Sequence, residues 1–349
     1  MSEQTNTVVK ARSFDAKKFF SDNAIWAVLV AMIIAMNFLI FARKGAWVFL
    51  TPNNIRTLFE SESVRGVLAF GVMVAILAKG TDLSTGSLAG MVAVMVASFV
   101  QPTDLSTRVL TGGFSLPPVI AILVGLLIGA CAGAIMGWLI AYTKIHPFIA
   151  TLGGQLIWRA IAKMYSNRPV SNLPDSFRAI ARVSYTTADG KTSSFPTIII
   201  VFILMFALSA FLLTQTRFGK NVYAIGGNDQ AARVAGINVE VNLMLVYVWC
   251  STCAALGGIL LAARTGSADA STYGLQYELD AIAAATVGGT SQTGGICRPS
   301  GALAGILIMG VINNGLVLMG VDDNMTNVIK GLIIVGAVVL DMRKNAGKK

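Results

Sequence analysis

Residues 197–213 read TIIIVFILMFALSAFLL, residues 243–263 read LMLVYVWCSTCAALGGILLAA, and residues 216–239 between them read TRFGKNVYAIGGNDQAARVAGINV. Each apolar run is about long enough for a helix to cross roughly 30 Å of hydrocarbon. Because a backbone in lipid must satisfy its own hydrogen bonds, these runs predict two membrane-spanning helices. The polar segment between them then lies at one membrane surface, where a soluble partner can reach it.

The whole chain has the composition of a membrane protein. Of its 349 residues, 55% are hydrophobic and 13% are charged, and the mean hydropathy is +0.70. Soluble domains carry about 25% charged residues. A β-barrel is disfavoured because the apolar residues form continuous runs instead of alternating. We therefore predict an all-α polytopic membrane protein with a transmembrane domain over residues 24–341.

About ten apolar stretches are candidate transmembrane helices, and glycine-rich segments break some of them. The stretches are 24–42, 64–79, 83–100, 118–141, 147–165, 196–214, 243–263, 277–293, 301–320 and 325–341. An even number of spans places both ends of the chain on the same side of the membrane.

The net charge of +10 is concentrated at the ends and in the loops. The basic residues at the two ends are Lys10, Arg12, Lys17, Lys18, Arg343, Lys344, Lys348 and Lys349. The positive-inside rule predicts a cytoplasmic N-terminal tail (1–23) and a basic cytoplasmic C-terminus (342–349). Counting spans then places the 216–242 loop in the cytoplasm and the 101–117 and 166–195 loops outside. The electrostatic partner of these charges is membrane lipid, and no nucleic acid is expected.

The polar 216–242 loop contains signals for a short helix. Asn228 is a good N-cap, and Gly236 is a natural left-handed stop. Two turns are too few for a stable isolated helix, so a second structure must brace this one. The small side chains of Ala231, Ala232 and Ala235 suit a groove on another protein. The alternative is a helix that lies at the lipid headgroups, but such helices usually carry larger apolar residues.

Residues 80–87, GTDLSTGS, place polar groups between two apolar stretches. Gly80 and Gly86 interrupt helix, while Asp82, Ser84 and Ser87 bring hydrogen-bonding groups next to the membrane interior. Non-helical backbone at that depth is tolerated only where it is buried or lines a cavity. Asp82 and Ser84 can equally cap a helix that starts at Leu83, and the two roles are compatible.

Residues 277–295, YELDAIAAATVGGTSQTGG, form a second broken segment. Glu278 and Asp280 are two positions apart and so do not share a helical face. The sequence therefore favours interaction of both with the helix dipole over a general acid–base pair. Broken glycine-rich segments in both halves of the chain hint at an internal duplication with a site between the halves.

The sequence shows no catalytic, nucleotide-binding or metal-binding motif. It contains no GxxxxGK[ST] phosphate loop, and its single histidine, His146, leaves the four cysteines without the partners of a zinc site. No Ser-His-Asp set or nucleotide fingerprint appears. We expect no enzyme activity, no metal and no cofactor bound by this chain. Four glycines spaced by four residues in 118–141 predict a face that another helix approaches closely.

The chain resembles the permease subunits of bacterial ABC sugar importers of the ribose/galactose group. The resemblance rests on GTDLSTGS (80–87), PFIATLGG (147–154), TRFGKNVYAIGGNDQAARVAGINV (216–239), YELDAIAAATVGGTSQTGG (277–295) and IKGLIIVGAVVLDMRK (329–344). These segments extend over most of the chain in the family's order. Thr81 and Tyr277-Glu278-Leu279-Asp280 are most similar to the galactose/methyl-galactoside branch, whereas Thr85 and Cys297-Arg298-Pro299 depart from the usual family pattern.

The resemblance implies partners and roles for individual residues. A cytoplasmic ABC ATPase with two nucleotide sites would hydrolyse ATP, a periplasmic sugar-binding protein would deliver sugar, and a second permease copy would complete the path in the bacterial inner membrane. The short helix would be the coupling helix seated in the ATPase, with Gly226, Asn228, Ala231, Ala232, Arg233 and Gly236 as its coupling residues.

We expect the substrate path to be lined by small and polar residues from three segments of the chain. Its residues are Asp82, Ser84, Ser87, Gln155, Trp158, Tyr277 and Glu278. Asp82 can accept two sugar hydroxyls, and Trp158 or Tyr277 can stack on the apolar face of a hexose. The alternative function is a proton-coupled secondary transporter of a small polar solute that uses Asp82 or Glu278. That function is disfavoured because both carboxylates are predicted at helix ends, where a charged group costs little free energy.

Overall fold

The computed structural model describes residues 24–105, 108–110, 115–186 and 192–346. Its helices are α2 (Ala24–Lys44), α3 (Pro52–Leu77), α4 (Thr85–Val100), α5 (Pro118–Thr143), α6 (Pro147–Tyr165), α7 (Asp175–Arg178), α8 (Thr197–Gln215), α9 (Arg217–Gly227), α10 (Asp229–Val234), α11 (Val239–Thr265), α12 (Tyr277–Val287), α13 (Pro299–Leu318) and α14 (Asp323–Ala346). Strands β1 (Val183–Thr186) and β2 (Thr192–Phe195) pair antiparallel, with Val183 opposite Phe195. The predicted all-α membrane architecture is confirmed, and a helix lies in each of the ten predicted stretches.

Six helices in the described part of the chain are long and apolar enough to cross a membrane: α2, α5, α8, α11, α13 and α14. The other four predicted spans differ from expectation for local reasons. Helix α3 begins twelve residues before the predicted 64–79 span. The sequence did not indicate these first turns as part of a span because they are polar. Helix α4 has 16 residues and α6 has 19. The predicted 277–293 span was wrong at its end, since α12 stops at Val287 and Gly289 turns the chain with φ +89°.

Helices α3 and α11 lie at the centre of the bundle, and most of their side chains from mid-helix onward are buried. The predicted glycine face lies on α5 and is confirmed as a close packing surface. A Cβ at Gly133 would lie 2.8 Å from Ser251, and one at Gly137 would lie 2.8 Å from the backbone of Met244, both on α11. The other side of α5 is exposed at residues such as Leu127 and Trp138. Helix α5 therefore packs against α11 through its glycine face and lies at the periphery of the bundle.

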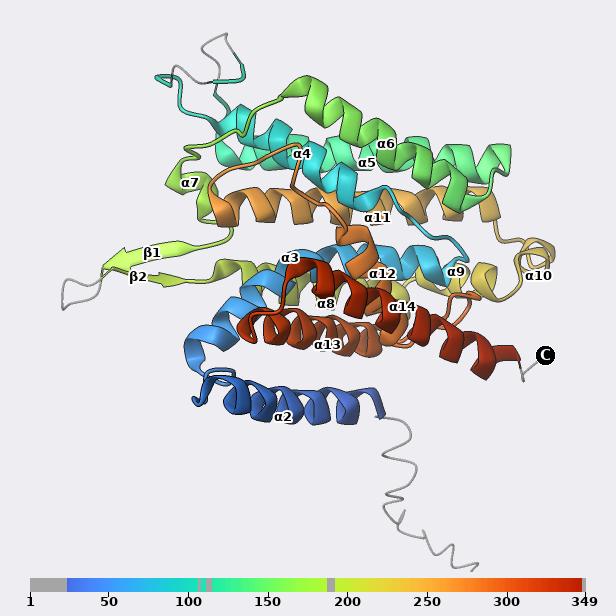
Figure 1. Cartoon of the computed structure of the whole chain (residues 1–349). Coiled ribbons are helices and arrows are strands. Elements are labelled where there is room, and N and C mark those ends of the chain that lie inside the picture. Colours follow the sequence, from blue (N-terminus) through green and yellow to red (C-terminus); the bar gives the residue numbers. More distant parts are fainter. Residues whose placement is uncertain (1–23, 106–107, 111–114, 187–191, 347–349) are drawn as a thin grey trace, which may run out of the picture.

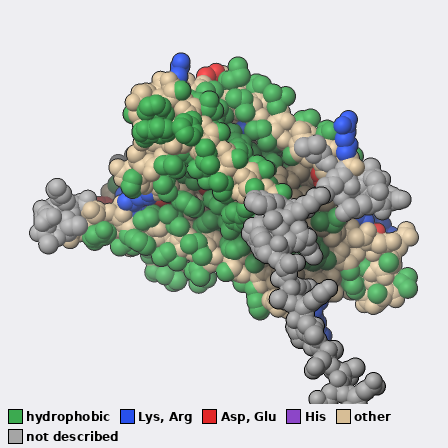
Figure 2. Space-filling model, turned by 90° about the horizontal axis from the view of Figure 1, so that it is seen from below, with side chains coloured by type: hydrophobic (Ala, Val, Ile, Leu, Met, Phe, Trp, Pro, Cys, Tyr) green, Lys and Arg blue, Asp and Glu red, His purple; other side chains and the backbone are tan. Residues whose placement is uncertain are grey.

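The long helices run roughly side by side and give the molecule two distinct ends (Figure 1). Helices α9 and α10, the start of α2 and the end of α14 lie at one end. The β1–β2 hairpin lies at the opposite end. The tail 1–23 and the last residues, including Lys348 and Lys349, lie outside the described residues. Hydrophobic side chains cover much of the face seen in Figure 2, as expected for a surface in contact with lipid.

Candidate functional site

Two helices, α4 and α12, begin inside the bundle instead of at one of its ends (Figure 1). The chain reaches α4 through the non-helical residues 78–84 and reaches α12 through residues 266–276. Both starting points are buried: Ser84 is fully enclosed and Glu278 is 5% exposed. Irregular backbone at this depth is tolerated because protein surrounds it.

The first turns of α4 and α12 touch at Gly86. A Cβ added there would collide with the Glu278 carboxylate and with the carbonyl oxygen of Gly274. Only glycine allows this approach, so Gly86 is required by the close contact and not by helix formation. The two half-helices thus direct their positive N-terminal ends toward one buried polar region. We call this region, comprising residues 81–87, 151–159, 270–276 and Glu278, the half-helix site.

Asp82 lies fully buried immediately before α4. Its Oδ1 accepts hydrogen bonds from the backbone nitrogen of Ser84 at 2.8 Å and from Ser84 Oγ at 2.6 Å. Asp82 therefore stabilises a turn immediately before α4, whereas Ser84, the N-cap residue of α4, makes no side-chain capping hydrogen bond, so the predicted side-chain cap was wrong. The second oxygen, Oδ2, is buried without a nitrogen or oxygen donor in the described part of the chain, and the Asp82 carboxylate interacts with the Cys250 thiol and with Tyr247, both on α11.

Glu278 connects α12 to α6. Its Oε1 accepts a hydrogen bond from Gln155 Nε2 at 2.8 Å, while Oε2 is buried and has no hydrogen-bond partner among the described residues. One turn beyond Gln155, Arg159 donates to the carbonyl oxygens of Ala270 at 3.0 Å and Tyr273 at 2.7 Å. Helix α6 therefore fixes both the start of α12 and the segment that leads to it.

Trp158 completes this cluster. It is 9% exposed, and its indole Nε1 has no hydrogen-bond partner in the described residues. Gly154, one turn earlier, separates it from Ser84: a Cβ there would lie 3.2 Å from Ser84 Cβ and 3.4 Å from Trp158 Nε1. The structure thus brings together the predicted path residues Asp82, Ser84, Gln155, Trp158 and Glu278, with Ser87 buried in the adjoining first turn of α4.

Tyr277 belongs to a different environment. Its ring lies beneath the guanidinium of Arg65 on α3, with 5.3 Å from Arg65 Cζ to the ring centroid. The neighbouring Asp280 pairs with Arg65 at 3.1 Å and with Lys330 of α14 at 3.0 Å, and Arg65 also pairs with Glu62 at 2.8 Å. The sequence did not predict this charge cluster. Asp280 is held by two cations as well as by the helix dipole.

The polar loop folds as two helices, and the sequence predicted only the second. Helix α9 begins after Thr216, whose Oγ1 accepts a hydrogen bond from the backbone nitrogen of Gly219 at 3.2 Å. Val222 and Ile225 are buried on one face of α9. Their helical spacing was the available signal, but three glycines in the helix concealed it.

Helix α10 has the predicted ends. Asn228 Oδ1 accepts a hydrogen bond from the backbone nitrogen of Ala231 at 3.0 Å, and Gly236 has φ +82°. The required brace comes from α9 and α11, because Ala232 packs with Ile225 and Val239 in a small apolar cluster. Arg233 pairs with Glu240 of α11 at 2.6 Å.

The coupling residues therefore divide into an inner and an outer set. Ala232 and Gly226 point inward: Ala232 is 3% exposed, and a Cβ at Gly226 would collide with the carbonyl oxygen of Leu77. Asn228, Ala231, Arg233 and Gly236 are exposed. Val234, which the sequence did not single out, is 91% exposed and is the most exposed large apolar residue among those whose side chains the structure describes.

Segment 288–298, which joins α12 to α13, contacts α9 and the end of α3. Tyr223 Oη of α9 donates to the carbonyl oxygen of Cys297 at 2.6 Å, and the backbone nitrogen of Gly295 donates to Leu77 O at 2.9 Å. Burial raises the pKa of the Cys297 thiol to about 11, so this thiol is neutral at physiological pH. All four cysteines are free, and no cluster of three or more potential metal-ligating acidic, Cys or His residues occurs in the described residues.

The half-helix site and α9–α10 both lie within the part of the chain that matches a known family. The model of the family described as "Branched-chain amino acid transport system / permease component" matches residues 54–338. This chain belongs to that permease family. Residues 1–53, which include α2 and the segment that leads to α3, and residues 339–349 lie outside the match.

Relatives of the permease are similar along nearly its whole length. The galactose/methyl galactoside import permease protein of Escherichia coli K12 is 37% identical over 346 residues, which cover 97% of this chain and 99% of the relative. The ribose import permease protein of the same strain is 34% identical over 340 residues, covering 97% and 99%. Its D-allose transport system permease protein is 34% identical over 342 residues, covering 96% and 97%. No solved structure matches the permease.

Proposed function

We propose that this permease is the membrane subunit of an ATP-driven ABC importer for a hexose, with galactose, a methyl galactoside or glucose as the substrate. The observation that carries the proposal is the full-length similarity to a galactose/methyl galactoside import permease. The relatives named for ribose and allose make monosaccharides the substrate class and galactose the first sugar to test.

The half-helix site supplies the chemistry that sugar recognition needs. Asp82 Oδ2 and Glu278 Oε2 can accept hydroxyl protons, and Trp158 Nε1 can donate to a sugar oxygen, because these buried atoms lack hydrogen-bond partners in the described residues. Ser84, Ser87 and Gln155 add further polar groups. Since these groups are enclosed, α4 and α12 must separate for a sugar to pass between them.

Helix α10 provides the docking element. A two-turn helix capped by Asn228 and braced through Ala232 presents Val234 and Ala231 outward. The exposed side chain of Val234 suits an apolar pocket on a cytoplasmic ATPase with two nucleotide sites. The end of the bundle with α9, α10, the start of α2 and the end of α14 is then cytoplasmic. No cofactor binds this chain, and the ATP is used by the partner subunit.

Two further partners complete the proposed importer. A periplasmic sugar-binding protein approaches the end with the β1–β2 hairpin, and a second copy of the permease forms the path together with the first. Lipid covers the remaining apolar surface, which includes Leu123 and Leu127 on the outer side of α5. In this arrangement, residues 24–341 form the transmembrane domain, and 1–23 and 342–349 are cytoplasmic tails.

The test is uptake of labelled galactose into proteoliposomes that contain the permease, the ATPase and the binding protein. We expect uptake with ATP on the ATPase side and none with a proton gradient alone. Competition by unlabelled galactose, ribose and allose ranks the sugars. The buried carboxylates Asp82 and Glu278 would also suit a proton-coupled transporter, so uptake that follows the proton gradient and ignores ATP would overturn the importer function.

A further inference from the structure

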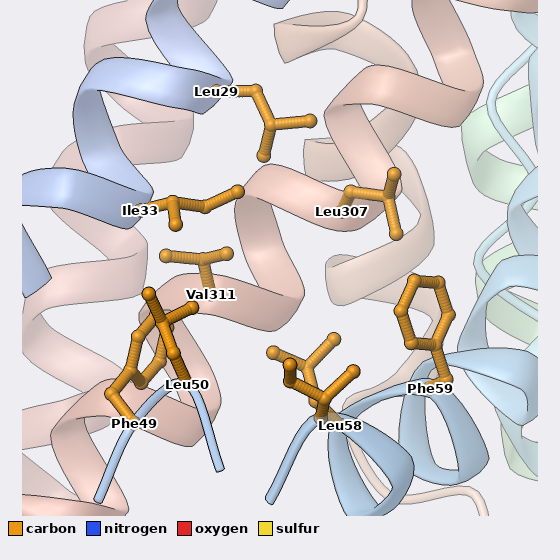
Figure 3. A pocket seen from close by; sticks show the side chains of 9 residues that line it. Leu29, Ile33, Phe49, Leu50, Leu58, Phe59, Leu307 and Val311 are labelled. Carbon is orange, nitrogen blue, oxygen red and sulfur yellow. The ribbon is translucent and has the colours of Figure 1, made fainter. Parts of the chain in front are cut away.

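A wholly apolar cavity of about 170 Å³ lies between α2, α3 and α13 (Figure 3). Leu29 and Ile33 come from α2, and Leu307 and Val311 come from α13. The remaining lining residues come from α3 and the segment before it: Phe49, Leu50, Ile55, Leu58 and Phe59. The side chains labelled in Figure 3 surround one central space.

The occupant of this cavity must be apolar, because none of the nine lining side chains carries a polar atom. A water molecule would find none of the two to four polar partners that it needs. The cavity also opens outward, since the lining residues Leu50 and Ile55 are 49% and 38% exposed. In a membrane-spanning chain, the abundant apolar molecules that can enter from outside are lipid acyl chains.

The depth of the cavity matches one leaflet of a bilayer. Ten residues separate Ile33 from Arg43 at the end of α2, which is about 15 Å along the helix axis at 1.5 Å per residue. Half of a hydrocarbon core of about 30 Å is also about 15 Å. A chain anchored near Arg43 therefore reaches the level of Ile33, and Leu29 lies one turn deeper.

The end of α2 nearest the opening carries positive charge. Arg43 and Lys44 occupy the last turn of α2 and are exposed, and neither forms an ion pair with another residue that the structure describes. Trp47 stacks on Phe41 with ring centroids 4.1 Å apart, in the manner of aromatic residues at a membrane surface. A basic site beside an apolar cleft suits an anionic headgroup.

We propose that the cavity holds the end of one acyl chain of an anionic phospholipid whose phosphate lies at Arg43 and Lys44, because a volume of this size takes roughly six carbon atoms. The bound chain fills the space between α2 and the two helices α3 and α13. It thereby attaches α2, which lies outside the family match, to the matched part of the permease. The site is independent of sugar, of the ATPase and of the proposed direction of transport.

The test uses the full-length permease in nanodiscs of equal amounts of dioleoyl-phosphatidylglycerol and dioleoyl-phosphatidylcholine, followed by native mass spectrometry of the retained lipid. We expect Val311→Trp, which fills the cavity, to lose the retained phosphatidylglycerol. The matched control is Val317→Trp on the same helix, where the side chain is 65% exposed and outside the cavity. Ile33→Trp and its exposed neighbour Ile34→Trp form a second pair, for use if Val311→Trp does not fold.

A charge variant tests the headgroup. Arg43→Gln combined with Lys44→Gln should lower the preference for phosphatidylglycerol over phosphatidylcholine about tenfold, because each basic residue near a membrane surface adds attraction for anionic lipid. Arg217→Gln combined with Lys220→Gln, at the other end of the molecule, should leave the preference unchanged. Equal lipid retention by the cavity-filling and control variants, or equal retention of the two lipids by the unaltered permease, would overturn the proposal.

Discussion

The half-helix site and helix α10 depart from the usual pattern of burial in opposite directions. The site encloses carboxylate and indole groups with unsatisfied atoms, which is costly in a protein interior. Helix α10 does the reverse, since it buries Ala232 and leaves Val234 in the open. The comparison indicates two different kinds of missing partner: a polar molecule inside the bundle and an apolar pocket outside it.

The largest expected effect comes from the ion cluster that supports the half-helix site. Replacing Asp280 with Asn leaves Arg65 and Lys330 without their shared carboxylate. Because removing one partner of a buried ion pair strands the other charge, we expect the free energy of unfolding to fall by about 3 kcal/mol. Thermal unfolding in detergent measures this change. The matched control is Asp175→Asn, whose side chain is 97% exposed beside Arg178, and an equal loss in both variants would contradict the role of burial.

Removing the Glu278 carboxylate tests the polar interior directly. We expect Glu278→Ala to lower the initial rate of ATP-driven galactose uptake about 50-fold, since hydrogen bonds to charged groups contribute about 1.5–3 kcal/mol each. Leu279→Ala, the exposed next residue, should transport normally. Normal uptake by the Glu278 variant in proteoliposomes would remove this residue from the substrate path.

Adding a charge to the exposed surface of α10 tests the other side of the comparison. We expect Val234→Asp to weaken binding of the ATPase about 30-fold, as for loss of a central interface contact of about 2 kcal/mol. Pull-down of the ATPase at a series of concentrations gives the affinity. The same change at Val183 of the β1–β2 hairpin should leave the affinity intact. Undiminished binding by the Val234 variant would show that α10 is not the docking surface.

The smallest effect is expected from the cap of α10. Asn228→Ala removes the hydrogen bond to the Ala231 nitrogen and should cost about 1 kcal/mol of helix stability. Binding of the ATPase should then weaken about fivefold. Asn238→Ala removes an equivalent cap from α11, where Asn238 Oδ1 accepts from Val241 N at 3.0 Å, and should not change binding. If both substitutions weakened ATPase binding equally, the effect would not be specific to α10.

The sequence predicted local features well. The apolar runs located a helix in every predicted span, and the caps Asn228 and Gly236 were identified because a cap depends on adjacent residues. The half-helix site could also be predicted from the sequence, since Asp82 and Glu278 interrupt apolar stretches. A carboxylate within such a stretch is a functional candidate by default, because a charge in the membrane interior is costly to keep.

Features that depend on distant pairing could not be predicted from the sequence. Arg65 and Asp280 are 215 positions apart, and no local pattern joins them. The argument that Asp82 and Glu278 lie at helix ends, where a charge costs little free energy, was wrong. The N-terminal ends of α4 and α12 lie inside the bundle. A two-turn helix also offers too little periodicity to show that Ala232 faces inward while Val234 faces outward.

The claim that sugar and the ATPase bind at separate sites is tested most directly by measuring ATPase retention and galactose uptake together in Glu278→Ala and Val234→Asp. We predict that the Glu278 variant retains the ATPase but does not take up galactose, whereas the Val234 variant loses both. Loss of the ATPase from the Glu278 variant, or full uptake by the Val234 variant, would contradict separate sites for sugar and for the ATPase.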